Sequence, residues 1–177
     1  MAVQALAGVL LTLTRAMSSL MLAMLPTSLC STFFWMSADP YDLERFVAAQ
    51  NAGGTYDRAI EELRRGFKTS HWMWFVFPQI AGLGQSPTSR KFAISSLDEA
   101  QAYLRHPVLG PRLMECAAIV AETAGRTAEQ IFGGIDAQKL HSSMTLFRRA
   151  APSEPLFAKV LDRYFDGLAD SATDARL

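Results

Sequence analysis

The residues best suited to chemistry gather in the segment 68–79, which reads KTSHWMWFVFPQ. An indole offers a flat stacking surface and one N–H donor, and a histidine exchanges a proton near neutral pH. A pocket that stacks a planar ligand and binds its polar edge would use such groups. We therefore predict a ligand site here, with His71 as the catalytic acid or base if the protein is an enzyme. The ligand-binding candidates in this segment are Lys68, Ser70, Trp72, Trp74 and Gln79.

The aromatic residues of this segment also suit a hydrophobic core, because aromatic side chains dominate protein interiors. We favour that simpler interpretation for the aromatic rings themselves. The basic residues Lys68 and His71 are harder to explain in a core. A cation beside two indoles needs a partner, solvent or a cation–π contact.

A second group of polar residues lies in the segment 136–147, which reads DAQKLHSSMTLF. On a helix, Lys139, Ser142 and Ser143 lie on neighbouring turns, with an aspartate at the N-terminal end. The two serine hydroxyls would face a ligand, or would allow close helix packing. These three residues are further ligand-binding candidates, as is Gln50 at the end of an earlier predicted helix.

Several kinds of site lack their signatures in this chain. There is no glycine-rich phosphate loop, no Gly-x-Ser-x-Gly elbow and no His-Glu-x-x-His motif. The three histidines, His71, His106 and His141, have no metal-ligand spacing, and His141 is predicted to lie on the surface. We therefore predict no metal and no cofactor. Lys+Arg and Asp+Glu number 17 each, and this zero net charge argues against a nucleic-acid binder.

Helix-capping signals punctuate the chain after residue 36. Ser96–Glu99 and Thr127–Gln130 have the spacing of capping boxes, and no convincing alternating strand pattern is present. The sequence predicts an all-α fold, a compact single domain of about seven short helices. This domain is expected to span residues 36–168, followed by a frayed tail at 169–177.

Residues 1–35 differ from the rest, since they are apolar and Arg15 is their only charge. They lack the basic start of a signal peptide and are too polar for a good membrane span. We favour Met36 as the true start, which makes the protein cytoplasmic and leaves Cys116 as an inert core cysteine. The alternative is a targeting or anchor segment, with the protein membrane-associated or exported.

The chain contains the segments FVAAQ (46–50), GFKTSHWMWFVFPQ (66–79), GLGQS (82–86), YLRHPVLGPRLMEC (103–116), IFGGIDAQKLHSSMTLF (131–147) and PLFAKVLDRYF (155–165). These segments resemble the bacterial family known as domain of unknown function 1810. The resemblance runs from about residue 39 to 166, so residues 1–35 have no counterpart in the family. It implies a mainly α-helical fold and no established activity. Some members are labelled calpastatin, a disordered protease inhibitor, and a helix-capped domain does not fit that label.

Three functions remain open from the sequence. We favour a domain that binds a small planar or phosphorylated metabolite in a polar and aromatic pocket. The second is a hydrolase-like domain that acts on a nucleotide derivative, with His71 as acid or base. The third is a protein–protein interaction domain with no small ligand. No nucleic-acid partner is expected, and no stable membrane insertion unless residues 1–35 belong to the protein.

Overall fold

A computed structural model describes residues 39–177 of the chain, so the segment 1–35 lies outside the described residues. Within residues 39–177 the chain forms helices and no strand; Ile80 and Ile94 make one isolated parallel bridge. The predicted all-α fold class is therefore confirmed. None of the described helices combines the length and the apolar character needed to cross a membrane.

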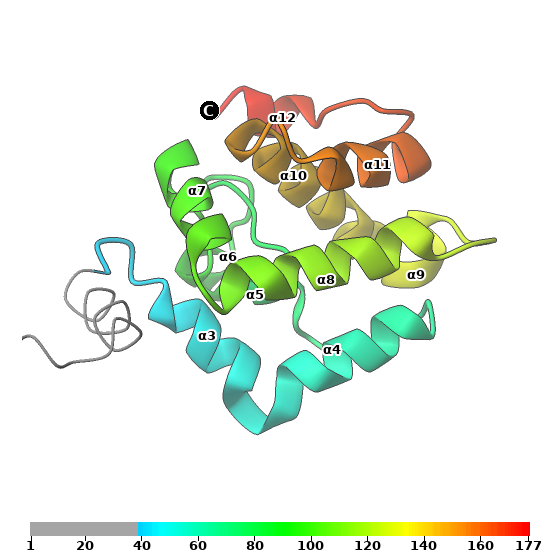
Figure 1. The fold of residues 1–177 in the computed structure, drawn as a ribbon, viewed down its shortest axis with the longest axis horizontal. Coiled ribbons are helices and arrows are strands. Elements are labelled where there is room, and N and C mark those ends of the chain that lie inside the picture. Colours follow the sequence, from blue (N-terminus) through cyan, green and yellow to red (C-terminus); the bar gives the residue numbers. More distant parts are fainter. Residues whose placement is uncertain (1–38) are drawn as a thin grey trace, which may run out of the picture. The chain divides into compact units, whose positions relative to one another are not determined.

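The described helices follow one another along the chain in the order labelled in Figure 1. They are α3 (Glu44–Asn51), the 3-10 turn η1 (Ala52–Gly54), α4 (Thr55–Arg64), α5 (Met73–Val76), α6 (Pro87–Lys91), α7 (Leu97–Arg105), α8 (Leu109–Glu122), α9 (Ala128–Phe132), α10 (Gly134–Ala150), α11 (Pro155–Tyr164) and α12 (Ser171–Asp174).

The two longest of these helices, α8 and α10, organise the core. Helix α10 packs against α7, α9, α11 and α12, and α8 packs against α4, α7 and α11. In Figure 1, α8 crosses the middle of the view with α10 and α11 on one side and α4 on the other. Cys116 on α8 is fully buried, as predicted, and burial raises the pKa of its thiol to about 12. It is therefore a packing residue and a poor nucleophile.

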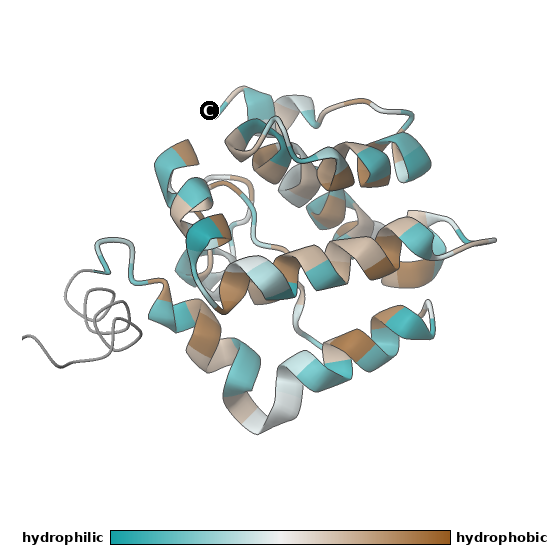
Figure 2. Ribbon diagram, in the orientation of Figure 1, coloured by the Kyte–Doolittle hydropathy of each residue, from teal (hydrophilic) through white to brown (hydrophobic). Residues whose placement is uncertain are grey.

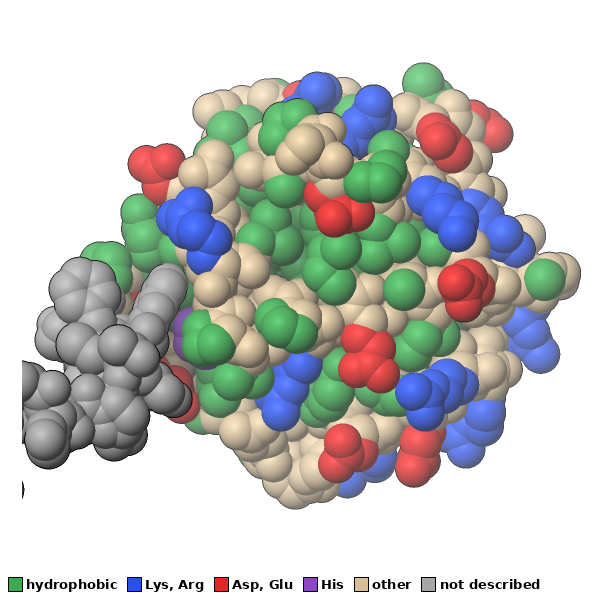
Figure 3. All heavy atoms as spheres, viewed as in Figure 1, with side chains coloured by type: hydrophobic (Ala, Val, Ile, Leu, Met, Phe, Trp, Pro, Cys, Tyr) green, Lys and Arg blue, Asp and Glu red, His purple; other side chains and the backbone are tan. Residues whose placement is uncertain are grey.

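Polar and apolar residues share the helices, as expected for helices that pack around a core (Figure 2). Figure 3 shows apolar side chains at the centre of one face, over α8 and α11, with charged side chains around them. On these two helices, Met114, Ile119 and Leu156 are half-buried and pack against the core. These side chains extend the core outward to the surface.

An ion pair attaches α3 to the start of α7. Arg45 Nη2 lies 2.6 Å from Glu99 Oε1, and both side chains are largely buried. The Glu99 carboxylate also accepts hydrogen bonds from Ser95 N and Oγ, at 2.8 and 2.6 Å. The predicted capping box at Ser96–Glu99 is therefore half formed, because Ser96 Oγ caps the helix while the glutamate turns to other partners. The box at Thr127–Gln130 has both of its bonds.

Residues 169–177, expected to form a frayed tail, carry the short helix α12 against α10. Asp170 caps this helix, since its Oδ2 accepts from Thr173 N and Oγ1 at 3.0 and 2.6 Å. Its own N–H donates to Thr145 Oγ1 on α10, at 2.9 Å. This attachment is polar, and a four-residue helix has no apolar stripe. Periodicity therefore carries no signal for it.

Gly110 provides a test of how closely α7 and α8 approach. A Cβ at this position would lie 2.0 Å from the backbone oxygen of Leu104, a distance that requires the backbone to move. Gly110→Ala is expected to lower the free energy of unfolding by about 1–3 kcal/mol, measured by urea titration.

Gly134→Ala is the matched control, because nothing lies within 4 Å of a Cβ at this first position of α10. Alanine has the higher helix propensity, so this change is expected to raise stability by up to about 1 kcal/mol. Equal stabilities of the two variants would contradict the close approach of α7 and α8.

Candidate ligand-binding site

Glu62 on α4 organises the segment that leads to α5. Its buried carboxylate accepts five hydrogen bonds from Thr69 N and Oγ1, Ser70 N and Oγ, and Trp72 Nε1, at 2.7–3.1 Å. Two predicted ligand-binding residues, Ser70 and Trp72, therefore have a partner within the protein. Glu62 is not among the residues predicted from the sequence, because a glutamate on an amphipathic helix usually faces water.

These hydrogen bonds determine the ionisation of Glu62. Burial alone would raise the pKa of the carboxyl group, but the donors of Thr69 and Ser70 outweigh burial and lower it to about 2. The carboxylate therefore stays charged at every physiological pH. A buried charge with this many donors holds the chain from residue 69 to 72 in one path.

Gln50, another predicted ligand-binding residue, is buried in the core. Its Nε2 donates to the backbone oxygen of Phe75 at 2.8 Å, and its Oε1 accepts from Arg112 Nη1 at 3.1 Å. The hydroxyl of Tyr103 lies 3.2 Å from the same Nε2. Gln50 thus connects α3, α5, α7 and α8, and is far from solvent.

His71, the predicted catalytic residue, is exposed. Within residues 39–177 it has no hydrogen-bond or ion-pair partner, and it does not line the pocket described below. Its neighbours in sequence, Ser70 and Trp72, both turn toward Glu62. A catalytic role for His71 therefore stays a prediction that no contact of this structure supports.

An ion cluster brings the two candidate segments together. Asp136 lies between two lysines, with Oδ2 at 2.6 Å from Lys68 Nζ and Oδ1 at 2.6 Å from Lys139 Nζ. Each ammonium also lies over an indole, that of Lys68 at 5.0 Å from the Trp72 ring and that of Lys139 at 4.5 Å from the Trp74 ring. Burial would raise the pKa of Asp136, but the two lysines hold it below its ordinary value. We call Lys68, Asp136 and Lys139 the lysine cluster.

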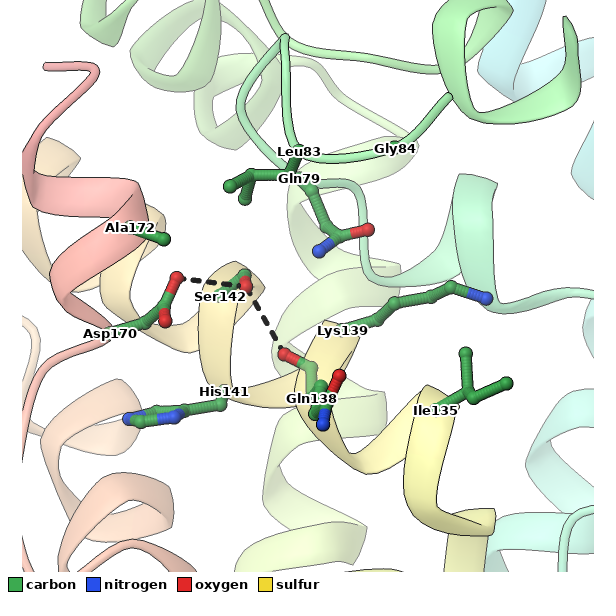
Figure 4. A pocket seen from close by; sticks show the side chains of 10 residues that line it. All are labelled: Gln79, Leu83, Gly84, Ile135, Gln138, Lys139, His141, Ser142, Asp170 and Ala172. Atoms are coloured by element: carbon green, nitrogen blue, oxygen red, sulfur yellow. Dashed lines mark hydrogen bonds between the residues drawn. The ribbon is translucent and has the colours of Figure 1, made fainter. Parts of the chain in front are cut away.

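A pocket of about 500 Å³ opens beside Lys139, between α10, the loop before α6 and the start of α12 (Figure 4). Three of the predicted ligand-binding residues, Gln79, Lys139 and Ser142, contribute to its wall. The full lining is Gln79, Leu83, Gly84, Ile135, Gln138, Lys139, His141, Ser142, Asp170 and Ala172.

The polar groups of the pocket come from three separate parts of the chain. The Gln79 amide points toward the middle of the pocket in Figure 4. On α10, Ser142 Oγ lies 3.0 Å from Asp170 Oδ2 and 3.1 Å from the backbone oxygen of Gln138. Asp170 comes from the region expected to be a tail, which is why the sequence analysis missed it.

His141 forms part of the pocket wall and is half-buried, although the sequence predicted a surface position. Its ring stacks on Phe165 with centroids 4.2 Å apart and planes 7° apart. Its Nε2 lies 2.9 Å from the backbone oxygen of Leu168, which holds the ring in place. The segment that follows α11 supplies both partners, and helical periodicity within α10 does not predict them.

The pocket offers groups for binding, and its histidine and serine are not arranged as a nucleophile and its base. Ser142 Oγ contacts a carboxylate and a carbonyl, while His141 Nε2 contacts a backbone oxygen. No group of three or more His, Cys, Asp or Glu residues within 39–177 is placed to hold a metal ion. The geometry therefore provides hydrogen-bond donors, acceptors and one ammonium group for a small molecule.

Ser143, the last predicted ligand-binding residue, is fully buried on α10. Its hydroxyl has no hydrogen-bond partner among the described residues. A buried hydroxyl without a partner is unusual, because a polar group that loses its hydrogen bonds to water and gains none in the protein costs free energy. Ser143 follows Lys139 by one helical turn, so both residues lie on one face of α10.

Replacement of Glu62 tests its structural role. Glu62→Gln keeps the size of the side chain but replaces one acceptor oxygen with an amide donor, so several of the five donors lose their partner. The free energy of unfolding is expected to fall by about 3 kcal/mol or more, measured by urea titration at neutral pH. Glu61→Gln, at the exposed neighbouring position, is the control and is expected to change it by less than about 0.5 kcal/mol. Similar losses in both variants would contradict the role of Glu62.

The lowered pKa of Glu62 predicts a defined acid sensitivity. The contribution of the Glu62 carboxylate to stability is complete above the ordinary pKa of 4.5 and disappears as the pH falls through about 2. The reason is that, on lowering the pH, the unfolded chain takes up this proton at a higher pH than the folded protein does. Over this range the group is expected to remove about 3 kcal/mol of stability. Urea titrations between these pH values would show a steeper fall for the native protein than for Glu62→Gln. Parallel curves would contradict the shift.

The comparisons with known proteins cover the whole of this architecture. The family model described as "Protein of unknown function (DUF1810)" matches residues 40–177. Among solved structures, the chain is similar to the conserved hypothetical protein Rv1873 from Mycobacterium tuberculosis, with 53% identity and a TM-score of 0.76. The match covers 78% of this chain and 98% of that chain. A search of curated proteins found no match. Glu62, the lysine cluster and the pocket all lie inside the matched residues, and the chain belongs to the DUF1810 family.

Proposed function

We propose that this protein is a small-molecule-binding domain whose ligand occupies the pocket between α10, residues 79–84 and residues 170–172. The observation that carries the proposal is the convergence of polar groups from three distant segments on one cavity of about 500 Å³. Ligand pockets typically measure about 300–1,000 Å³ and combine apolar walls with a few placed polar groups. Leu83, Ile135 and Ala172 supply apolar wall here.

Each wall of the pocket is held by contacts of its own. Gln79 sits beside the isolated bridge, where its backbone oxygen accepts from Ile94 N at 2.8 Å. Asp170 is attached to α10 through Thr145, and the ammonium group of Lys139 is held by Asp136 one turn earlier on α10. A site that is ordered before binding loses less conformational entropy when the ligand enters. These contacts therefore support binding by a pocket that is already formed.

The indoles contribute less to the pocket than the sequence suggests. Trp72 is fully buried and has no face for a ligand. Trp74 is half-buried, and the ammonium of Lys139 lies over its ring. Neither indole lines the pocket, so a planar ligand inside it would not stack on Trp72 or Trp74. Recognition in this pocket therefore rests on hydrogen bonds and charge, with no need for a flat ligand.

Filling the pocket tests the proposal. Ala172 is exposed and its Cβ faces the cavity in Figure 4, so Ala172→Phe places a ring in the opening without entering the core. We expect polar fragments detected by saturation-transfer NMR with the native full chain to lose their signal in this variant. Gln79→Leu removes the central amide at similar volume and is expected to weaken binding about tenfold.

Ala175→Phe is the matched control, because Ala175 is exposed on the same terminal segment and does not line the pocket. It is expected to bind as the native protein does. Thermal melting of each variant checks that the fold is retained. Fragments that bind equally to the native protein and to Ala172→Phe, or a screen without any binding, would refute the proposed site.

A further inference from the structure

We propose that the ligand of this pocket carries an anionic group, a carboxylate or a phosphate, which binds at the Lys139 end. This inference rests on the proposed function and specifies the chemical class of the ligand. Its basis is the juxtaposition of the pocket with the lysine cluster, in which two ammonium groups share one carboxylate.

The lysine cluster holds one more positive charge than negative. Asp136 is the ion-pair partner of both Lys68 and Lys139, so two positive charges face one negative charge. The side chains of Lys68 and Lys139 are only 7% and 17% exposed. Removing an ammonium from water is costly unless an opposite charge accompanies it. Cation–π contacts with Trp72 and Trp74 offset part of that cost and add no negative charge.

The charges of the pocket are arranged along one direction. Figure 4 shows Asp170 on one side, Lys139 on the other and the Gln79 amide between them. Asp170 already accepts hydrogen bonds from Ser142 and Thr173, and its negative charge repels an anion at that end. An anionic group therefore has one favourable position, beside Lys139. The amide of Gln79 is placed to donate to the part of the ligand between the two ends.

Pairs of probes that differ in charge test the inference with the full chain. Succinate is compared with succinamide, and ribose 5-phosphate with ribose, by isothermal titration calorimetry. We expect the anionic member of at least one pair to bind about tenfold or more tightly than its neutral partner. The pair that responds distinguishes a carboxylate from a phosphate. Added salt is expected to weaken the anionic member selectively.

Variants of the lysine cluster locate the anion. Lys139→Gln is expected to weaken binding of the anionic probe about tenfold or more, whereas Lys139→Arg keeps the charge and most of the affinity. Lys159→Gln, at an exposed position on α11 outside the pocket, is the control and is expected to bind normally. If Lys139→Gln loses its native melting transition, Lys68→Gln takes its place as the test variant. It removes one positive charge from the lysine cluster at a residue that does not line the pocket, and it is also expected to weaken binding of the anionic probe.

The outcomes separate this inference from the proposed function. Absence of binding by both anionic probes, or equal binding by neutral and anionic members, overturns the anionic class. Unchanged affinity in folded Lys139→Gln and Lys68→Gln overturns it as well. If neutral fragments bind the native protein and lose their signal in Ala172→Phe, the pocket binds small molecules but not specifically anionic ones. If no anionic probe binds and no fragment responds to Ala172→Phe, the pocket itself is refuted.

Discussion

The ionised carboxylate of Glu62 is the interaction on which the arrangement of this domain depends. A buried carboxylate is strongly unfavourable unless donors replace the water it has lost. Here the donors are consecutive parts of one segment, Thr69, Ser70 and Trp72. The chain between α4 and α5 has no helix or strand of its own. The hydrogen bonds to this carboxylate therefore do what the backbone hydrogen bonds of a helix or sheet do elsewhere. Its hydrogen bonds turn a loop into a fixed element of the core.

The position of Lys68 follows from that fixed segment. Its backbone N–H donates to the oxygen of Ile131 at 2.8 Å, and its ammonium reaches Asp136 at the start of α10. Asp136 in turn holds Lys139, one turn further along, which lines the pocket. Glu62 on α4 is thus connected to the pocket first through the segment that it holds and then through two ion pairs of Asp136. The polar residues of the aromatic segment act mainly by supporting this connection.

Local signals in the sequence predict the helices well but not the partners of their polar side chains. The capping box of Thr127 and Gln130 forms within four residues, so the sequence contains everything it needs. Glu62 and Asp170 depend on groups brought to them by the tertiary fold, and their own sequence surroundings are ordinary. The sequence marks Ser70 as a ligand-binding candidate, whereas in the structure its hydroxyl donates to the carboxylate of Glu62. Residue type therefore revealed which side chains needed a partner, and only the fold showed which partner it was.

The lysine cluster joins a structural contact to the proposed binding pocket in one group of residues. Its single carboxylate attaches the aromatic segment to α10 and leaves one positive charge beside the pocket. The free domain carries this uncompensated charge in a position with little access to water. A bound anion would remove that cost, and any ligand specific for the folded state stabilises it by mass action. Under the proposal of an anionic ligand, the energetic penalty left by folding would therefore become a source of binding affinity.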